Sequence, residues 1–204
     1  TLYLESGERA AIRRIVRRDG ATALWMVAPG ILSAEGIHAA QMSELTGIEM
    51  RFDRMSGAWG GGGPLQQYLC DFEHPITRGL RPGTIFGADS PIGPLVYTDD
   101  PQAEVLGRLI LPHTRSGPPG LAAKEQAGWK SVFCAVPNAP SDLLRNIARF
   151  AGCHIYSDRD DLVYANSRFL AMHALSAGVK RVTLPRNTDV QDAFSGRRVA
   201  SRAR

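Results

Sequence analysis

The chain has 204 residues, of which 44% are apolar, and a formal net charge of +4. A chain of this length buries about 70% of the surface that its unfolded form exposes, so it can form one sizeable hydrophobic core. It contains no run of about 18 or more apolar residues and no signal-peptide pattern, which predicts a soluble protein without a membrane partner. The excess charge lies in Arg197, Arg198, Arg202 and Arg204, with no aromatic residues among them, so nucleic-acid binding is not predicted.

The first part of the chain alternates predicted helices and strands. Ser6 is a typical N-cap residue, and the apolar spacing after it predicts a helix to about Asp19. The segment ATALWMVAPG predicts a buried strand that ends in a Pro-Gly turn. A second helix is expected between Ser33 and Gly47, followed by a strand over IEMRF. This alternation is typical of a parallel α/β sheet.

The rest of the chain predicts a second alternating region after a loop-rich one. Residues 57 to 120 are rich in glycine and proline and predict loops and antiparallel or edge strands, with short strands in GTIFG, GPLVYTDD and VLGRLIL. Then KSVFCAV predicts a strand, NAPSDLLRNIARFAG a helix, CHIYS a closing core strand, and LVYANSRFLAMHAL a short strand and helix. We expect a doubly wound, mostly parallel flavodoxin-like or class I glutamine amidotransferase-like domain over residues 1–178, and a β-rich segment with a basic tail over 179–204.

No catalytic cysteine is predicted. Consecutive strand residues point to opposite faces of a sheet, so Cys153 and His154 cannot pair in a strand. Cys134 lies in VFCAV, without the sharp strand-to-helix elbow that an activated nucleophile needs. Together with Cys70, these cysteines are expected to be small buried hydrophobes, which favours a reducing compartment such as the cytoplasm. Neither a metal site nor a cofactor is predicted, because the histidines and cysteines lack ligand spacing.

Two further patterns could supply catalytic or phosphate-binding groups but favour structural roles. The neighbouring pairs Asp99–Asp100 and Asp160–Asp161 occur in turn-like contexts, where aspartates commonly bond nearby backbone, and do not predict a glycosidase pair. The loop GAWGGGGPLQQY lacks the GK[ST] ending of a phosphate-binding loop. It is expected to be a loop that carries Trp59.

A ligand of an open parallel sheet would bind beyond the carboxyl ends of the strands. The residues predicted at those ends are Gly30, Asn138, Ser157 and Asp158. They are the candidate ligand-binding residues.

Several segments together resemble the beta-galactosidase trimerisation domain, a class I glutamine amidotransferase-like domain of bacterial glycoside hydrolases. They are ALWMVAPGIL, MSELTGIEM, HPITRGL, VYTDDPQAEVLGRL, GWKSVFCAVPNAPSDLLRNIARFAGCHIY and LVYANSRFLAMHA. The resemblance extends from about Leu2 to Ala177, and residues 129 to 173 carry most of it. The tail VTLPRNTDVQDAFSG resembles the β-rich segment that follows the domain in such enzymes.

The resemblance implies a non-catalytic, structural function. Members of the family have an amidotransferase-like fold but have generally lost the cysteine-histidine-glutamate triad, and they assemble, typically as trimers. The catalytic glutamates of the parent enzymes lie on a separate barrel that this chain does not contain, so no catalytic residue is carried over. We expect a homo-oligomer, a trimer by the resemblance, that packs against the glycoside hydrolase barrel of a parent protein in carbohydrate metabolism. The loops between residues 57 and 120 are the expected interface.

Two other functions stay open at the level of the sequence. One is a small hydrolase or transferase of amidotransferase-like fold with an unrecognised nucleophile at the strand ends. The other is a carbohydrate-binding module in which Trp59, Trp129 or Tyr156 stacks on a sugar. Whether the chain is a fragment or a free-standing protein is also open.

Overall fold

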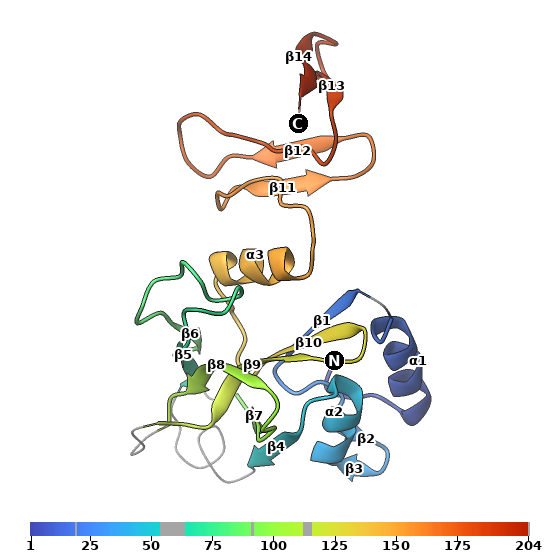
Figure 1. Cartoon of the computed structure of the whole chain (residues 1–204), viewed down its shortest axis with the longest axis vertical. Coiled ribbons are helices and arrows are strands. Elements are labelled where there is room, and N and C mark those ends of the chain that lie inside the picture. Colours follow the sequence, from blue (N-terminus) through green and yellow to red (C-terminus); the bar gives the residue numbers. More distant parts are fainter. Residues whose placement is uncertain (19, 54–63, 91, 112–115, 204) are drawn as a thin grey trace. The chain divides into compact units, whose positions relative to one another are not determined.

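Figure 1 shows the computed structural model, which describes residues 1–18, 20–53, 64–90, 92–111 and 116–203. The chain divides into two units, Thr1–Asn146 and Ile147–Arg204. This division falls at a different place from the domain boundary expected after residue 178, which stays a prediction. Residues 57–63 of the expected Trp59 loop lie outside the described residues. Its last residues, LQQY, are not a loop, because they belong to strand β5 (Leu65–Leu69).

The first unit holds two short helices and ten strands among its described residues. The helices are α1 (Ser6–Val16) and α2 (Ala39–Thr46). The strands are β1 (Ala21–Met26), β2 (Leu32–Ser33), β3 (Gly36–Ile37), β4 (Met50–Asp53), β5 (Leu65–Leu69), β6 (Ile85–Ala88), β7 (Leu95–Thr98), β8 (Glu104–Leu109), β9 (Pro119–Glu125) and β10 (Trp129–Cys134). A third helix, α3 (Ser141–Phe150), begins in this unit and ends in the next.

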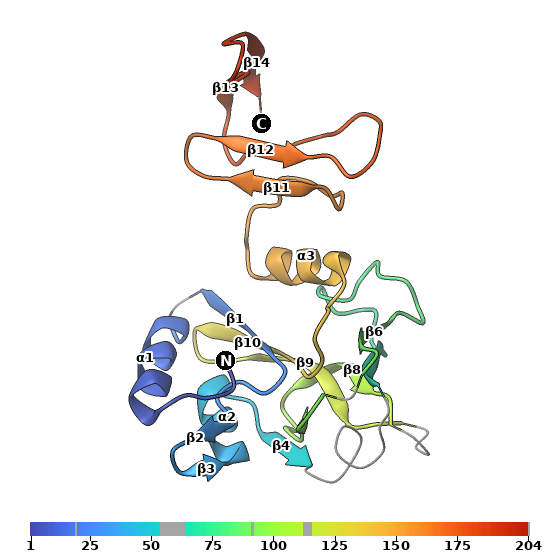
Figure 2. The same cartoon turned by 180° about the vertical axis from the view of Figure 1, so that it is seen from behind.

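A six-stranded sheet forms the body of the first unit, in the order β1-β10-β9-β8-β5-β6. Its strands are parallel between β1 and β10 and antiparallel at every other junction. The sheet is curled into a half-barrel. Next to it, β4 and β7 form an antiparallel pair, and β2 and β3 form a small hairpin. β1 lies at one end of the sheet, beyond β10, in both views (Figure 1, Figure 2).

The doubly wound, flavodoxin-like α/β fold expected from the sequence is therefore wrong. Strands account for 34% of the described residues and helices for 16%. A parallel pair needs a long crossover connection, usually a helix, whereas short turns join antiparallel strands. The connection between β9 and β10 is Gln126–Gly128, and no helix lies between β4 and β10 in the described residues, so these strands run back and forth.

Local strand predictions were better than the predicted topology. The strands expected in GTIFG, GPLVYTDD and VLGRLIL are confirmed as β6, β7 and β8. Residues 57 to 120 thus supply much of the sheet, including β5, β6 and β8. The IEMRF strand is confirmed as β4, but it pairs antiparallel with β7 instead of joining β1.

The ends of the helices follow ordinary capping chemistry. Helix α1 has its N-cap at Glu5 rather than at the expected Ser6, and the Glu5 N–H donates to the Glu8 carboxylate at 2.8 Å. Helix α2 begins later than expected, because the residues after Ser33 form the β2–β3 hairpin. It ends as expected at Gly47, whose φ of 71° lies in the left-handed region that glycine favours.

The second unit contains two hairpins and few buried residues. One pairs β11 (Leu162–Ala165) with β12 (Leu170–His173), and the other pairs β13 (Thr188–Gln191) with β14 (Arg198–Ala203). The short strand expected in LVYANSRFLAMHAL is β11, but the helix expected in the same segment is absent, and β12 forms there instead. The expected core strand CHIYS is not a strand, and Cys153 and His154 are exposed. Of the buried apolar residues in the described chain, Ile147 alone belongs to this unit, so the hydrophobic core lies in the first unit.

Candidate functional site

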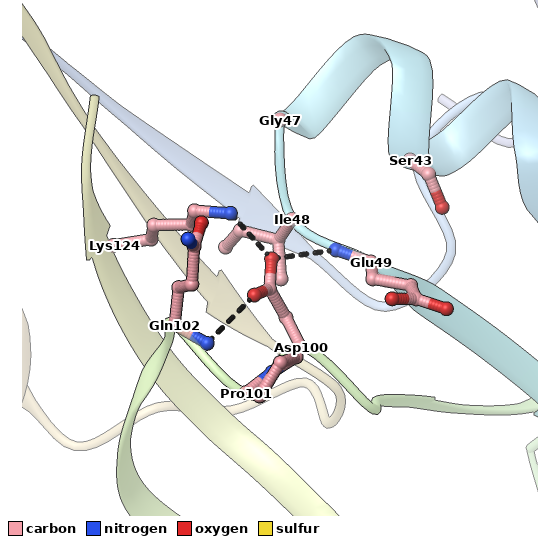
Figure 3. Close-up of a pocket in the computed structure, with 8 residues that line it drawn as sticks. All are labelled: Ser43, Gly47, Ile48, Glu49, Asp100, Pro101, Gln102 and Lys124. Atoms are coloured by element: carbon pink, nitrogen blue, oxygen red, sulfur yellow. Dashed lines mark hydrogen bonds and ion pairs between the residues drawn. The ribbon is translucent and has the colours of Figure 1, made fainter. Parts of the chain in front are cut away.

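An open pocket of about 460 Å³ lies in the first unit, where the end of α2 meets the turn after β7 and strand β9. Figure 3 shows the side chains around it. The lining residues are Ser43, Gly47, Ile48, Glu49, Asp100, Pro101, Gln102 and Lys124. Helix α2 contributes the first of these, and Gly47 turns the chain from the helix toward β4.

The antiparallel pairing of β4 with β7 brings the polar residues of the pocket together. Glu49 precedes β4, and Asp99 and Asp100 follow β7. The Asp99 N–H donates to the Glu49 carbonyl oxygen at 3.0 Å, and the Thr98 hydroxyl donates to the same oxygen at 2.9 Å. These bonds extend the β4–β7 ladder to the rim of the pocket and hold Asp100 beside Glu49.

Asp100 is the central polar group of the pocket. Its carboxylate accepts hydrogen bonds from the Glu49 N–H at 3.0 Å, the Gln102 N–H at 2.9 Å and the Lys124 ammonium group at 2.7 Å (Figure 3). The Asp100 side chain is 5% exposed and that of Lys124 is 16% exposed. Burial opposes ionisation of the carboxyl, but the bonds from Lys124 and the two amides outweigh it, so the pKa of Asp100 lies below its usual value. Asp100 is therefore ionised at neutral pH and is not suited to act as a general acid.

The side chains of Ser43 and Glu49 also have partners within the chain. Ser43 Oγ accepts from the Met50 N–H at 2.9 Å and donates to the Ala39 carbonyl at 3.2 Å. The Glu49 carboxylate forms an ion pair with Arg51 at 2.8 Å. No histidine or cysteine lines the pocket. The arrangement is that of a clamp that fixes the turn after β7 against α2 and β9, rather than a nucleophile held beside a base.

The structure also accounts for the cysteines. Cys134 is buried in β10, accepts a hydrogen bond from the Gln67 side-chain amide at 3.3 Å and donates to the Val136 carbonyl at 3.2 Å. Burial raises the pKa of the Cys134 thiol to about 11, so it stays protonated near neutral pH. Cys134 is the buried hydrophobe that was expected, whereas the same expectation for Cys70 and Cys153 is wrong, since both are exposed.

Two of the four candidate ligand-binding residues follow the parallel strands β1 and β10. Gly30 has a φ of 62°, and a Cβ there would lie 3.0 Å from Leu4 Cδ1, so its lack of a side chain serves packing. Asn138, with a φ of 58°, donates through its side-chain amide to the Gly87 carbonyl at 3.1 Å. Both contacts connect parts of the first unit, and a ligand-binding role for these two residues stays a prediction.

The other two candidates belong to the second unit. Ser157 Oγ accepts a hydrogen bond from the Arg159 N–H at 3.1 Å. Asp158 forms an ion pair with Arg149. Their partners are local, and their role in ligand binding also stays a prediction.

One buried polar network was not predicted from the sequence. The Trp25 indole N–H donates to Ser131 Oγ at 3.0 Å, and the Ser131 hydroxyl donates to the Thr46 carbonyl at 2.6 Å. It joins β1, β10 and the end of α2, which are far apart in the sequence, so no local pattern could have revealed it. Trp129, one of the candidate sugar-stacking residues, is buried, and the Arg17 guanidinium lies 5.7 Å from the centre of its ring.

In the ranges that the structure describes, no group of three histidine, cysteine, aspartate or glutamate residues is placed to hold a metal ion. The helices in those ranges are all too short or too polar to cross a membrane. Neither a family model nor a curated protein matches the chain.

Proposed function

We propose that this chain is a non-catalytic assembly domain that associates with copies of itself. The observation that carries the proposal is the exposure of large apolar side chains in the second unit. Those with more than a third of their surface exposed are Leu162, Tyr164, Phe169, Leu170, Leu175, Val179, Phe194 and Val199. Phe194 and Val179 are almost fully exposed, at 102% and 93%.

This exposure is unusual for hairpins that must persist in water. A two-stranded hairpin is at best marginally stable by itself. Apolar exposure of this extent in a unit with almost no buried core commonly marks a surface that another molecule covers. Burying one such side chain contributes about 1.5–3 kcal/mol, so a contact that covers several of them can offset the several kcal/mol that association costs.

Two other points support an assembly function. The side chains of Asp100, Ser43 and Glu49 in the pocket and the thiol of Cys134 are already bonded within the chain, which leaves them poorly placed for chemistry. The resemblance of residues 129 to 173 to the beta-galactosidase trimerisation domain favours a closed homo-oligomer, with a trimer as the expected form. The amidotransferase-like fold of that family is not part of the proposal.

The test is the solution mass of the full chain, measured by light scattering behind a sizing column over a range of concentrations. We expect an oligomer whose mass falls on dilution. Phe194→Asp and Tyr164→Asp should each lower the mass of the oligomer, because a charge would replace an apolar contact. Ile15→Asp is the matched control, since Ile15 is 58% exposed but lies in the first unit. A wild-type chain that is monomeric at every concentration would overturn the proposal.

A further inference from the structure

The outer edge of β1 is an unpaired row of backbone hydrogen-bonding groups. β1 is an end strand of the sheet and pairs with β10 on one side. The Val27 N–H donates to the Cys134 carbonyl at 2.8 Å, and backbone groups alternate in direction along a strand. The N–H and C=O groups of Thr22, Leu24 and Met26 therefore point away from β10. Within the described chain, no hydrogen bond reaches these outward groups.

β1 lacks the features that usually protect an edge strand. Proteins block edges with lysine, proline, bulges or very short strands. The segment ATALWM has six residues and contains no charge, proline or glycine. Its side chains alternate, with Ala23 and Trp25 buried and Leu24 and Met26 exposed on the other face.

The opposite edge of the same sheet is protected. β6 has four residues, and Gly87 within it has a φ of 140°, outside the conformation of a regular strand. The Gly87 carbonyl accepts a hydrogen bond from the Asn138 side chain. Only one of the two ends of this sheet, as far as the structure describes it, is thus open to a further strand.

We propose that β1 pairs in antiparallel orientation with β1 of a second copy of this chain, joining two six-stranded sheets into one. A two-fold axis beside Leu24 would place Leu24 opposite its own copy and Thr22 opposite Met26. Each residue in this register points its N–H and C=O outward, so the pairing satisfies about six backbone hydrogen bonds. The side chains of Leu24 and Met26 from both copies then form one apolar strip across the junction.

The distribution of charge favours the antiparallel direction. Arg17, Arg18 and Asp19 lie just before β1, whereas the residues that follow it, from Val27 to Leu32, are apolar. An antiparallel pair places the arginines of the two copies at opposite ends of the junction. A parallel pair would bring them together, and like charges placed opposite each other destabilise strand pairing. Self-association through an identical strand is also the usual form of a two-fold interface.

This inference goes beyond the assembly proposed for the second unit, because it rests on a different part of the chain. Leu24→Lys puts a charge on the open edge and should raise the dissociation constant of the pairing roughly tenfold or more. Ile85→Lys is the matched control, because Ile85 is an exposed apolar residue of the protected edge strand β6. Circular dichroism of each variant checks that the sheet is retained.

The register is tested by cross-linking. Directly opposed residues of a hydrogen-bonded antiparallel pair have Cα atoms about 5.5 Å apart, within the range that a disulfide spans. With the exposed Cys70 and Cys153 replaced by serine, we expect Leu24→Cys to form a disulfide-linked dimer on oxidation and Ile85→Cys to remain monomeric on a denaturing gel.

The outcomes separate the two proposals. An oligomer that Phe194→Asp reduces to a dimer, and that Leu24→Lys then dissociates, would support both. An oligomer of unchanged mass in Leu24→Lys, or one in which residue 24 does not cross-link, would overturn β1 pairing and leave the assembly of the second unit standing. A wild-type chain that stays monomeric would overturn both.

Discussion

At the scale of single residues, the ion pair of Asp100 with Lys124 is expected to hold the pocket together. Removing one partner of a buried ion pair leaves the other charge buried without a counter-charge. This lowers the free energy of unfolding by roughly 3 kcal/mol or more. For a chain of this size that corresponds to a fall in Tm of about 6–12 °C for Asp100→Ala, measured by thermal unfolding. Asp99→Ala is the control, because Asp99 is exposed and its ion pair with Arg51 should contribute about 1 kcal/mol at most. Equal falls in Tm for the two variants would contradict the role of the Asp100–Lys124 pair in holding the pocket together.

The same carboxylate should make the stability depend on pH. The pKa of Asp100 is lowered in the folded chain, so its contribution is present above the unfolded pKa of about 3.9 and is lost as pH falls through the folded value. We expect the difference in free energy of unfolding between the wild type and Asp100→Asn to be constant from about pH 7 to 5 and to shrink below about pH 4. Urea titrations across this range would measure it. A difference that does not change with pH would show that the carboxylate is not the group responsible.

The three cysteines should differ in reactivity. Iodoacetamide reacts with an accessible thiolate. Cys70 and Cys153 are exposed, whereas Cys134 is buried and has a pKa of about 11. Mass spectrometry of the native chain at pH 8 should therefore show at most two modifications, with the third added only in denaturant. Rapid modification of Cys134 in the native chain would contradict its burial and would support the alternative function, a hydrolase or transferase with Cys134 as its nucleophile.

Local patterns revealed part of the site and missed the rest for a physical reason. The expectation that Asp100 bonds nearby backbone is confirmed by its bond from the Gln102 N–H, because that contact is only two residues away. The pairing of Asp100 with Lys124 depends on β9 lying beside the turn after β7. No spacing within a single segment specifies that contact.

At the scale of elements, the network of Trp25, Ser131 and Thr46 should stabilise the parallel pair of β1 and β10. Ser131→Ala removes the acceptor of the Trp25 indole N–H and the donor to the Thr46 carbonyl, leaving two buried polar groups unpaired. We expect a loss of about 1–3 kcal/mol in the free energy of unfolding, measured in urea. Ser6→Ala is the control, because Ser6 is exposed, and it should change stability by less than about 0.5 kcal/mol. A similar result for both variants would mean that the network is energetically neutral.

The elements themselves were easier to predict than their directions. Apolar and β-branched runs identified β6, β7 and β8, because strand formation depends on local residue preferences. The direction of β4 depends instead on β7, which lies far along the chain. The strand predicted in CHIYS is absent. Its local pattern is typical of a strand, but in the described chain it pairs with no other strand.

At the scale of the whole molecule, the two units should differ in local stability. The buried core lies in the first unit, whereas the hairpins of the second have almost no buried apolar residues. Amides of β8, β9 and β10 should therefore exchange with deuterium much more slowly than those of β11 to β14 in dilute samples. Assembly through the second unit should slow exchange in the hairpins as the concentration rises. Hairpin amides protected as well as those of β9 at the lowest concentration would contradict this difference.

The pairing of β1 with β10 has a consequence for synthesis of the chain. Ala21 pairs with Trp129, so the first strand to be made has its partner among the last strands of the sheet. Translation at about 5–20 residues per second leaves roughly 5–20 s between the two. During that interval the uncharged ATALWM segment has neither of its edges covered by a strand of this sheet. Nascent chains are therefore most susceptible to chaperone binding, or to aggregation with neighbouring nascent chains, before β10 has left the ribosome.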